Sequence, residues 1–216
     1  MSTFESNNIS NDRQVGITFF DEGYLSFTPS SEDADTPWPK RLEHFKTQSL
    51  QPYPIREQFT PAWSPAYITT LKNGSSVLRA DLMVFDLHGC HMNDAFQFLS
   101  DNLLAGAVHS TESGGLTSPR CRVILLLNRA VNHNTYKSLW RRIAHEVFDE
   151  MSAPAHADFR QRFNSPHCAS NRPGKPTMRA SEGYPLYVDG ALSAEHLHYD
   201  ALGNISVDYA EGYESD

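Results

Sequence analysis

The segment from Arg79 to Gly89, with the sequence RADLMVFDLHG, constrains the fold of this chain more than any other stretch. Its centre, Leu82 to Phe85, is an uninterrupted apolar run, which is typical of a strand buried on both faces. Because side chains alternate along a strand, Asp86 and His88 are expected on one face and Leu87 on the other. A carboxylate and an imidazole at the end of a buried strand suit a divalent cation, and they equally suit a solvated strand end.

The size and composition of the chain favour a self-sufficient core. With 216 residues and 39% hydrophobic composition, it is long enough to bury a sizeable interior. We expect one domain, residues 15–202, between a disordered arm, residues 1–14, and an acidic tail, residues 203–216. The three cysteines lack a CxxC spacing, which argues for a reducing compartment. Without a signal-peptide pattern or an apolar run of about 20 residues, we expect a cytoplasmic protein with no membrane contact.

The periodicity of apolar residues predicts an α+β fold, with helices packed on one side of a central mixed or antiparallel sheet. Gly106 is expected to end a helix that begins at Asn93. An acidic, proline-punctuated loop is expected at 30–39, and a terminal strand or hairpin at 183–192. The other expected strands are 15–20, 67–71, 79–89, 107–110, 121–127 and 196–199, and the other expected helices are 40–47 and 134–148.

The distribution of charge is more informative than its sum. A net charge of −8 disfavours general nucleic-acid binding. Between Arg120 and Arg179, however, there are eleven Lys or Arg against four Asp or Glu, and the rest of the chain has seven against twenty-two. This basic block offers phosphates a local positive surface, unless its arginines pair with acids elsewhere in the fold.

The order of these pieces resembles the archaeo-eukaryotic primase superfamily, in particular the primase-polymerase domains of replication proteins from plasmids, phages and other mobile elements. In those domains a strand ending in Asp-x-Asp-Gly precedes a helix, a Ser-x-His turn, a strand with an Arg-Val run, a second helix and a third acidic residue. The matching pieces are Val84 to Gly89 (VFDLHG), Asp94 to Leu104, Val108 to Gly114 (VHSTESG), Arg120 to Ala130 (RCRVILLLNRA), Tyr136 to Phe148 and Asp158 to Pro166 (DFRQRFNSP).

The resemblance implies an RRM-like primase-polymerase core and metal-dependent, template-directed nucleotidyl transfer with Mg²⁺ or Mn²⁺. It implies that Asp86, His88 and Asp158 are the catalytic residues and the metal ligands. Nucleotide binding falls to Ser110, Ser113, Arg122, Arg129 and Lys137. The implied partners are DNA template and primer, nucleoside triphosphates and a helicase or another replication protein.

The sequence departs from the family pattern at the positions where the chemistry takes place. His88 replaces the second Asp, and the segment Glu112 to Gly114 lacks the histidine of the Ser-x-His turn. The family also has a Ser-Arg step after the Arg-Val strand, and Asn128 replaces its serine. A histidine in place of a carboxylate makes the site less anionic and shifts its preference from magnesium toward manganese or zinc. An active site and a degenerate one both fit these changes.

Three functions therefore remain open at this stage. The first is a primase-polymerase, the second is an inactive nucleic-acid-binding module with the same fold, and the third is an acidic interaction protein. Individual residues also have alternative explanations. Arg129 and Lys137 suit solvated surface positions, and Asp158 suits an ion pair with Arg160 or Arg162. A structural zinc site is a further alternative, with ligands from His88, Cys90, His91, His167 and Cys168.

Overall fold

The computed structural model describes residues 13–20, 31–50, 61–70, 76–111, 119–149, 151–166, 178–194, 197–199 and 205–207. Most of the expected arm, residues 1–14, and of the expected tail, residues 203–216, lies outside these ranges. So does the segment from Glu112 to Gly114, which includes the expected nucleotide-binding Ser113.

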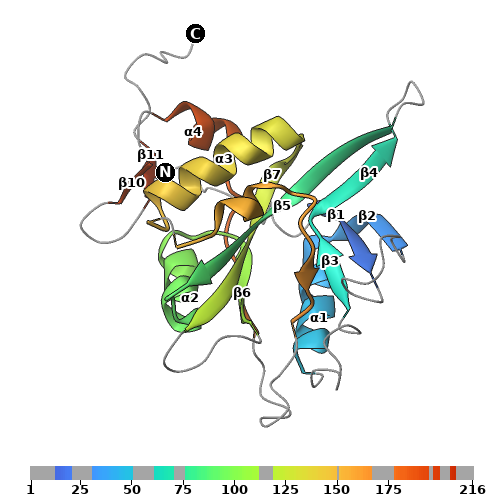
Figure 1. The fold of residues 1–216 in the computed structure, drawn as a ribbon, viewed down its shortest axis with the longest axis horizontal. Coiled ribbons are helices and arrows are strands. Elements are labelled where there is room, and N and C mark those ends of the chain that lie inside the picture. The colour runs from blue at the N-terminus through green and yellow to red at the C-terminus, as the bar shows by residue number, and fades with distance from the viewer. Residues whose placement is uncertain are drawn as a thin grey trace, which may run out of the picture.

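Two antiparallel sheets form the framework of the molecule (Figure 1). The larger has the order β4-β5-β7-β6-β9, with β4 Ala66–Thr70, β5 Ser76–His88, β7 Arg120–Val131, β6 Gly106–Ser110 and β9 Met178–Ser181. The smaller has the order β2-β1-β3-β8, with β2 Ser31–Pro37, β1 Gln14–Phe20, β3 Ala62–Ser64 and β8 Phe163–Asn164. A separate pair joins β10 Leu197–Tyr199 to β11 Ile205–Val207. The predicted α+β class is confirmed.

Helices cover both faces of the larger sheet (Figure 1). On one face lie α2, Met92–Asp101, and α3, His133–Glu146, and the ring of Phe85 stacks on that of Trp140 at 5.4 Å. On the other face lie α1, Trp38–Ser49, and the smaller sheet. The expectation of helices on one side only was wrong. The apolar runs of β5 and β7 present hydrophobic side chains on both faces, so each face needs a cover.

Two local expectations were also wrong, and one strand was missed. Residues 31–37 form β2 rather than a loop, because their backbone pairs with β1 from Gln14 to Phe19. This pairing does not depend on the apolar alternation by which strands were predicted. Within 183–192, only single bridges form at Tyr184 and Leu186, and the short helix α4, Val188–Ser193, follows. The amide of Val188 donates to the side chain of Asn128 at 3.0 Å, which helps this helix to begin. The strand β9 had not been predicted.

Gly106 starts β6 and does not end α2, whose C-cap is Asn102. The left-handed residue after the helix is Leu103, with φ of 51°. At Gly106 a Cβ atom would lie 2.4 Å from the carbonyl oxygen of Ile124, so the close approach of two strands requires glycine there. The end of the helix at Asn102 and the tight strand contact at Gly106 are only a few residues apart. The sequence pattern did not show which of the two features required the glycine.

Side chains of α3 replace a neighbouring strand along part of β5. The pairing of β4 with β5 ends at Ala80, so Val84 has no strand on that side. The Val84 amide donates to the Tyr136 hydroxyl at 3.2 Å, and the Trp140 indole donates to the Val84 carbonyl at 2.8 Å. Because Tyr136 and Trp140 are four residues apart, they lie on one face of the helix and satisfy both backbone groups of one residue.

Tyr136→Phe is expected to lower the free energy of unfolding by about 1 to 2 kcal/mol, because it leaves the buried Val84 amide without its acceptor. Urea denaturation of the full chain measures this. Tyr184→Phe is the matched control, since the Tyr184 side chain is 54% exposed and should contribute little. Equal stability of the Tyr136→Phe variant and the unmodified chain would contradict the assigned hydrogen bond.

A polar cluster joins the two sheets. Asp81, in β5, is 1% exposed and its carboxylate accepts hydrogen bonds from Arg13 and, at 3.0 Å, from the Gly16 amide of β1. Burial, together with the nearby Asp81 carboxylate, raises the pKa of Tyr67, in β4. A Cβ on Gly16 would lie 2.4 Å from the Tyr67 ring, so glycine allows β1 to pass against the aromatic face.

Candidate functional site

A row of polar side chains crosses the larger sheet where the apolar core ends. Asp86 of β5 pairs in register with Arg122 of β7, and Arg122 pairs with His109 of β6. By alternation these three lie on the face that packs against the smaller sheet, whereas Leu87 is buried with α2 and α3. The predicted alternation at the end of β5 is confirmed for Asp86 and Leu87.

Arg122 is the most constrained cation of this row. Its Nη2 donates to Asp86 Oδ2 at 2.9 Å, and its Nη1 donates to the carbonyl of Asn164 at 2.9 Å. The guanidinium lies 4.7 Å from the centre of the Phe163 ring, and the side chain is 8% exposed. Its buried Nε has no hydrogen-bond acceptor among the described residues. An arginine in an apolar strand is therefore tolerated through an ion pair, a carbonyl and an aromatic face.

His88 and Arg120 form the next cross-strand pair on this face, two residues along each strand from Asp86 and Arg122. The Arg120 Nη2 lies 2.6 Å from His88 Nδ1 and 2.9 Å from Nε2. Gly89 follows with φ of 80°, a left-handed conformation that suits glycine and turns the chain away from the strand. An imidazole nitrogen that accepts a hydrogen bond from a guanidinium has its lone pair engaged, which makes it a poor metal ligand in this arrangement.

Asp158 is not brought together with Asp86 and His88. Its carboxylate accepts a hydrogen bond from the Arg160 side chain at 2.7 Å and lies 3.8 Å from His133 Nδ1, at the first turn of α3. The hydrogen bond from Arg160 lowers the pKa of Asp158. Of the two alternatives for Asp158, a metal ligand or an ion pair with Arg160, the ion pair is therefore the one observed.

The residues present do not fit the expected metal centre. Within the described ranges, no group of three His, Cys, Asp or Glu side chains is placed to hold a metal ion. Asp86 is instead neutralised by Arg122, and Asp158 by Arg160. The expected three-ligand site of Asp86, His88 and Asp158 is therefore not assembled in this part of the chain, and no catalytic step through a metal follows from its geometry.

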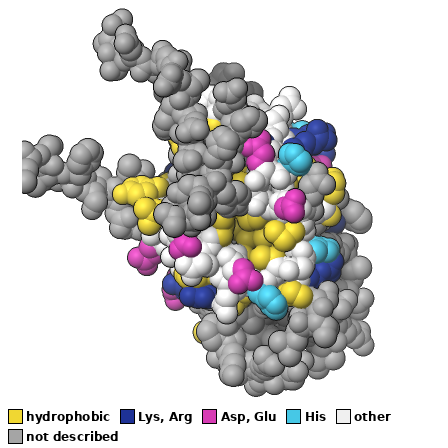
Figure 2. Space-filling view, turned by 90° about the vertical axis from the view of Figure 1, so that its left-hand side faces the viewer, with side chains coloured by type: hydrophobic (Ala, Val, Ile, Leu, Met, Phe, Trp, Pro, Cys, Tyr) yellow, Lys and Arg dark blue, Asp and Glu magenta, His cyan; other side chains and the backbone are white. Residues whose placement is uncertain are grey.

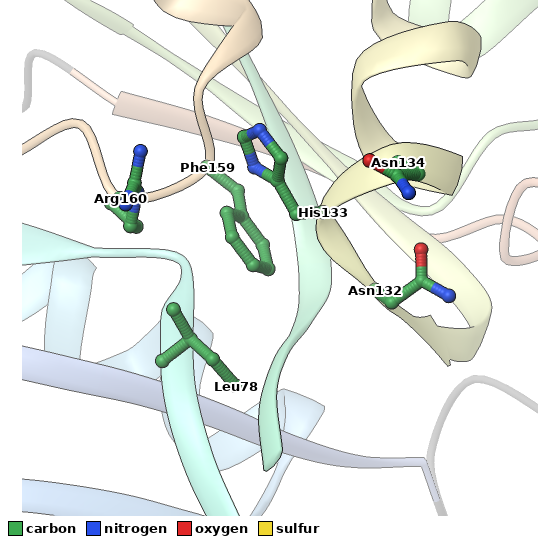
Figure 3. A pocket seen from close by; sticks show the side chains of 6 residues that line it. All are labelled: Leu78, Asn132, His133, Asn134, Phe159 and Arg160. Atoms are coloured by element: carbon green, nitrogen blue, oxygen red, sulfur yellow. The ribbon is translucent and has the colours of Figure 1, made fainter.

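A pocket of about 380 Å³ lies next to Asp158 (Figure 3). Its lining includes the first turn of α3, and the His133 ring stands beside that of Phe159, with the ring centres 5.2 Å apart. In Figure 3, Arg160 lies on one side of these rings and the amides of Asn132 and Asn134 lie on the other. The pocket is thus separate from the row that contains Asp86 and Arg122.

Among the expected nucleotide-binding residues that the structure describes, only Arg122 bonds to Asp86. Ser110 follows His109 in β6, and by alternation its side chain lies on the opposite face of the sheet. Arg129 pairs with Asp189, and this contact raises the pKa of Arg129. Lys137 lies on α3, which also covers the opposite face.

Sequence reasoning missed His109, Arg120 and Asn164 as neighbours of Arg122. A weak signal existed for His109, because it has the same strand parity as the buried Ala107 and therefore faces the same side. In the family pattern the histidine follows the serine, whereas in VHSTESG His109 precedes Ser110. The contact of Asn164 had no sequence signal, because it depends on the pairing of β8 with β3.

Four of the eleven cations in the basic block are paired with nearby acids. Its members Arg122, Arg129, Arg142 and Arg160 each form an ion pair, with Asp86, Asp189, Glu146 and Asp158 respectively. Figure 2 shows one face of the molecule, on which the Lys and Arg side chains stand in separate groups, with Asp and Glu between them. These four arginines are thus neutralised by acids within the fold. The face in Figure 2 has no continuous basic patch among its described residues.

Comparison with known proteins gives structural matches. No protein-family model and no curated protein sequence matches the chain. The AEP domain of the primase-polymerase from cyanophage S-2L matches with a TM-score of 0.45 and 8% identity, over 83% of this chain and 87% of that domain. The polymerase domain of Mycobacterium tuberculosis ligase D, solved in complex with DNA, matches with a TM-score of 0.41 and 12% identity, over 85% of this chain and 82% of that domain.

Among the helices that the structure describes, none has the length and apolar composition that crossing a bilayer requires.

The two matches cover most of the chain, and both are to polymerase domains.

Proposed function

We propose that this chain is a primase-polymerase-like domain that binds nucleic acid, with Arg120 and Arg122 contacting phosphates at the edge of the larger sheet. The observation that carries this proposal is the arrangement of Arg122. Its guanidinium is fixed by Asp86 and the Asn164 carbonyl, while its Nε retains an unused donor. A fixed, incompletely satisfied guanidinium suits the oxygens of a phosphate better than those of water.

The charges around Arg122 support the same conclusion. Arg120 and Arg122 together carry two positive charges, and Asp86 supplies one negative charge. Two cations therefore lie close together at this edge of the sheet, although the chain as a whole carries −8. Arg120 is the more accessible of the two cations, so a phosphate contacts it first and has Arg122 behind it. In a phage or plasmid replication protein, DNA, nucleoside triphosphates and a helicase would be the partners of such a domain.

The test is the affinity of the full chain for a fluorescent single-stranded DNA oligonucleotide, measured over a series of salt concentrations. Arg120→Ala is expected to weaken binding severalfold and to reduce the slope of log K against log salt by about 1. Arg141→Ala is the matched control, because Arg141 is an exposed arginine on α3, over the opposite face of the sheet. No binding at low salt, or an equal loss in both variants, would overturn the proposal.

Nucleotidyl transfer is the second candidate function. It is favoured by the position of Asp86 at the end of β5, and it requires that this carboxylate leave its ion pair with Arg122 before it can bind a metal ion. Primer synthesis by the full chain with manganese and labelled nucleotides tests it. Asp86→Asn should abolish synthesis, and Asp101→Asn, on the exposed side of α2, should not. Absence of synthesis by the unmodified chain would leave the binding function alone.

A further inference from the structure

The pocket at the first turn of α3 is lined by different chemistry on its two sides (Figure 3). The Arg160 side chain lies on one side, the amides of Asn132 and Asn134 lie on the other, and the His133 ring stands between them. Leu78 of β5 adds an apolar side chain to the lining. A ligand that spans this pocket therefore needs an anionic group at one end and a planar, hydrogen-bonding group at the other.

The His133 ring is supported from the core. Phe159, which is 1% exposed, contacts it with the ring centres 5.2 Å apart, and the Tyr136 ring lies 5.5 Å from that of Phe159. The His133 side chain itself is 39% exposed, so part of its ring is open to a ligand. A supported and accessible aromatic ring is a stacking surface for a nucleobase.

The Arg160 guanidinium is held in position by Asp158. The carboxylate accepts hydrogen bonds from Nε at 3.0 Å and from Nη2 at 2.7 Å. Among the described residues Nη1 has no acceptor, and the Arg160 side chain is 64% exposed, so one edge of the guanidinium is available to a phosphate. Because Asp158 already balances the charge of Arg160, this position suits one phosphate group better than a chain of three.

We propose that this pocket binds a nucleoside monophosphate, with the base stacked on His133 and the phosphate bonded to Arg160. The Asn132 oxygen already accepts from the Thr135 amide at 3.0 Å, so Asn134 is the amide that remains for the edge of the base. A carboxamide offers a donor and an acceptor side by side, which matches the pair that adenine presents.

The size and position of the pocket agree with this ligand. Its volume of about 380 Å³ lies within the range of small-molecule sites, about 300 to 1,000 Å³. It is separate from Arg120 and Arg122, so the proposal does not rest on the proposed DNA-binding function.

Isothermal titration calorimetry of the folded full chain with AMP, ATP, adenosine and inorganic phosphate tests the ligand class. AMP should bind more tightly than each of the others. Equal affinity for adenosine would mean that the phosphate makes no contact, and equal affinity for inorganic phosphate would mean that the base makes none. Either result, tighter binding of ATP, or no binding of AMP would overturn the proposal.

Two variants test the assigned contacts. Arg160→Gln should weaken AMP binding by about tenfold or more, because it removes hydrogen bonds to a charged group. His133→Ala should weaken it by about fivefold or more, because the stacking surface is lost. Arg141→Ala is the matched control, since Arg141 is an exposed arginine further along α3 and should leave AMP affinity unchanged. No loss in either pocket variant, or an equal loss in the control, would contradict these contacts.

Asp158→Asn separates charge from structure. It keeps an acceptor for Arg160 and removes the negative charge beside the phosphate, so AMP should bind more tightly and the preference for AMP over ATP should shrink. Weaker binding of both nucleotides would overturn the assigned charge balance. If the chain binds AMP in this pattern but binds no DNA, the DNA-binding function fails and the nucleotide site stands.

Discussion

Asp81→Ala is expected to lower the free energy of unfolding by about 3 kcal/mol or more, because it leaves the donors of a buried carboxylate without an acceptor. Arg13 and the Gly16 amide both donate to Asp81, which is almost completely buried. These groups belong to both sheets, so the loss falls on the junction between them. Urea denaturation, followed by tryptophan fluorescence, measures the change.

Two further variants separate charge from hydrogen bonding at this junction. Asp81→Asn keeps one acceptor oxygen for the Gly16 amide and removes the ion pair with Arg13, so it should cost less than Asp81→Ala. Asp101→Ala, in the exposed part of α2, should change stability by a few tenths of a kcal/mol. If Asp81→Ala resembled the Asp101 variant, the assignment of Asp81 as the link between the sheets would be wrong.

Arg122→Ala is expected to affect both stability and binding. It removes the guanidinium from its mostly buried ion pair with Asp86, which is 18% exposed, at a cost of about 3 kcal/mol. It also removes the inner cation of the proposed phosphate site, so the affinity for single-stranded DNA should fall by at least about tenfold. Denaturation gives the first effect, and titration of the folded variant gives the second.

The ion pair itself is isolated by a double-mutant cycle. The combined Asp86→Ala and Arg122→Ala variant should be more stable than the sum of the two single changes predicts, because neither charge is then left unpaired. Arg122→Lys keeps the charge but loses the forked geometry that reaches both Asp86 and the Asn164 carbonyl, so it should not restore full affinity. Additive single effects, or full affinity in Arg122→Lys, would contradict the assigned contacts.

The elements that the sequence predicted well are those whose side chains alone determine their structure. The apolar runs of β5 and β7 and the helical period of α3 each correspond to an observed element. Asn132 starts α3 by accepting a hydrogen bond from the Thr135 amide, two residues before the predicted first residue. By contrast β2 is acidic and forms through backbone pairing with β1, which has no signature in its own side chains.

The candidate site was predictable only where it depended on one strand and its neighbour. Arg122 stood out because an arginine inside an apolar strand needs a partner, and Asp86 is that partner. For Asp158 the sequence left two alternatives open, and the ion pair with Arg160, two residues away, is the one that forms. The neighbours His109 and Asn164 depend on strand register and on pairing between distant segments, which a single sequence does not specify.

The late position of β8 in the chain has a consequence for synthesis on the ribosome. The smaller sheet is completed when Phe163 and Asn164 pair with Trp63 and Ala62, roughly 100 residues after β3 has been translated. At ordinary elongation rates this interval lasts about 5 to 20 s. Until then the nascent chain has an open strand at Trp63, and Arg122, once made, has no Asn164 carbonyl to bind. Chaperone occupancy of stalled nascent chains should therefore decline only after β8 has left the exit tunnel.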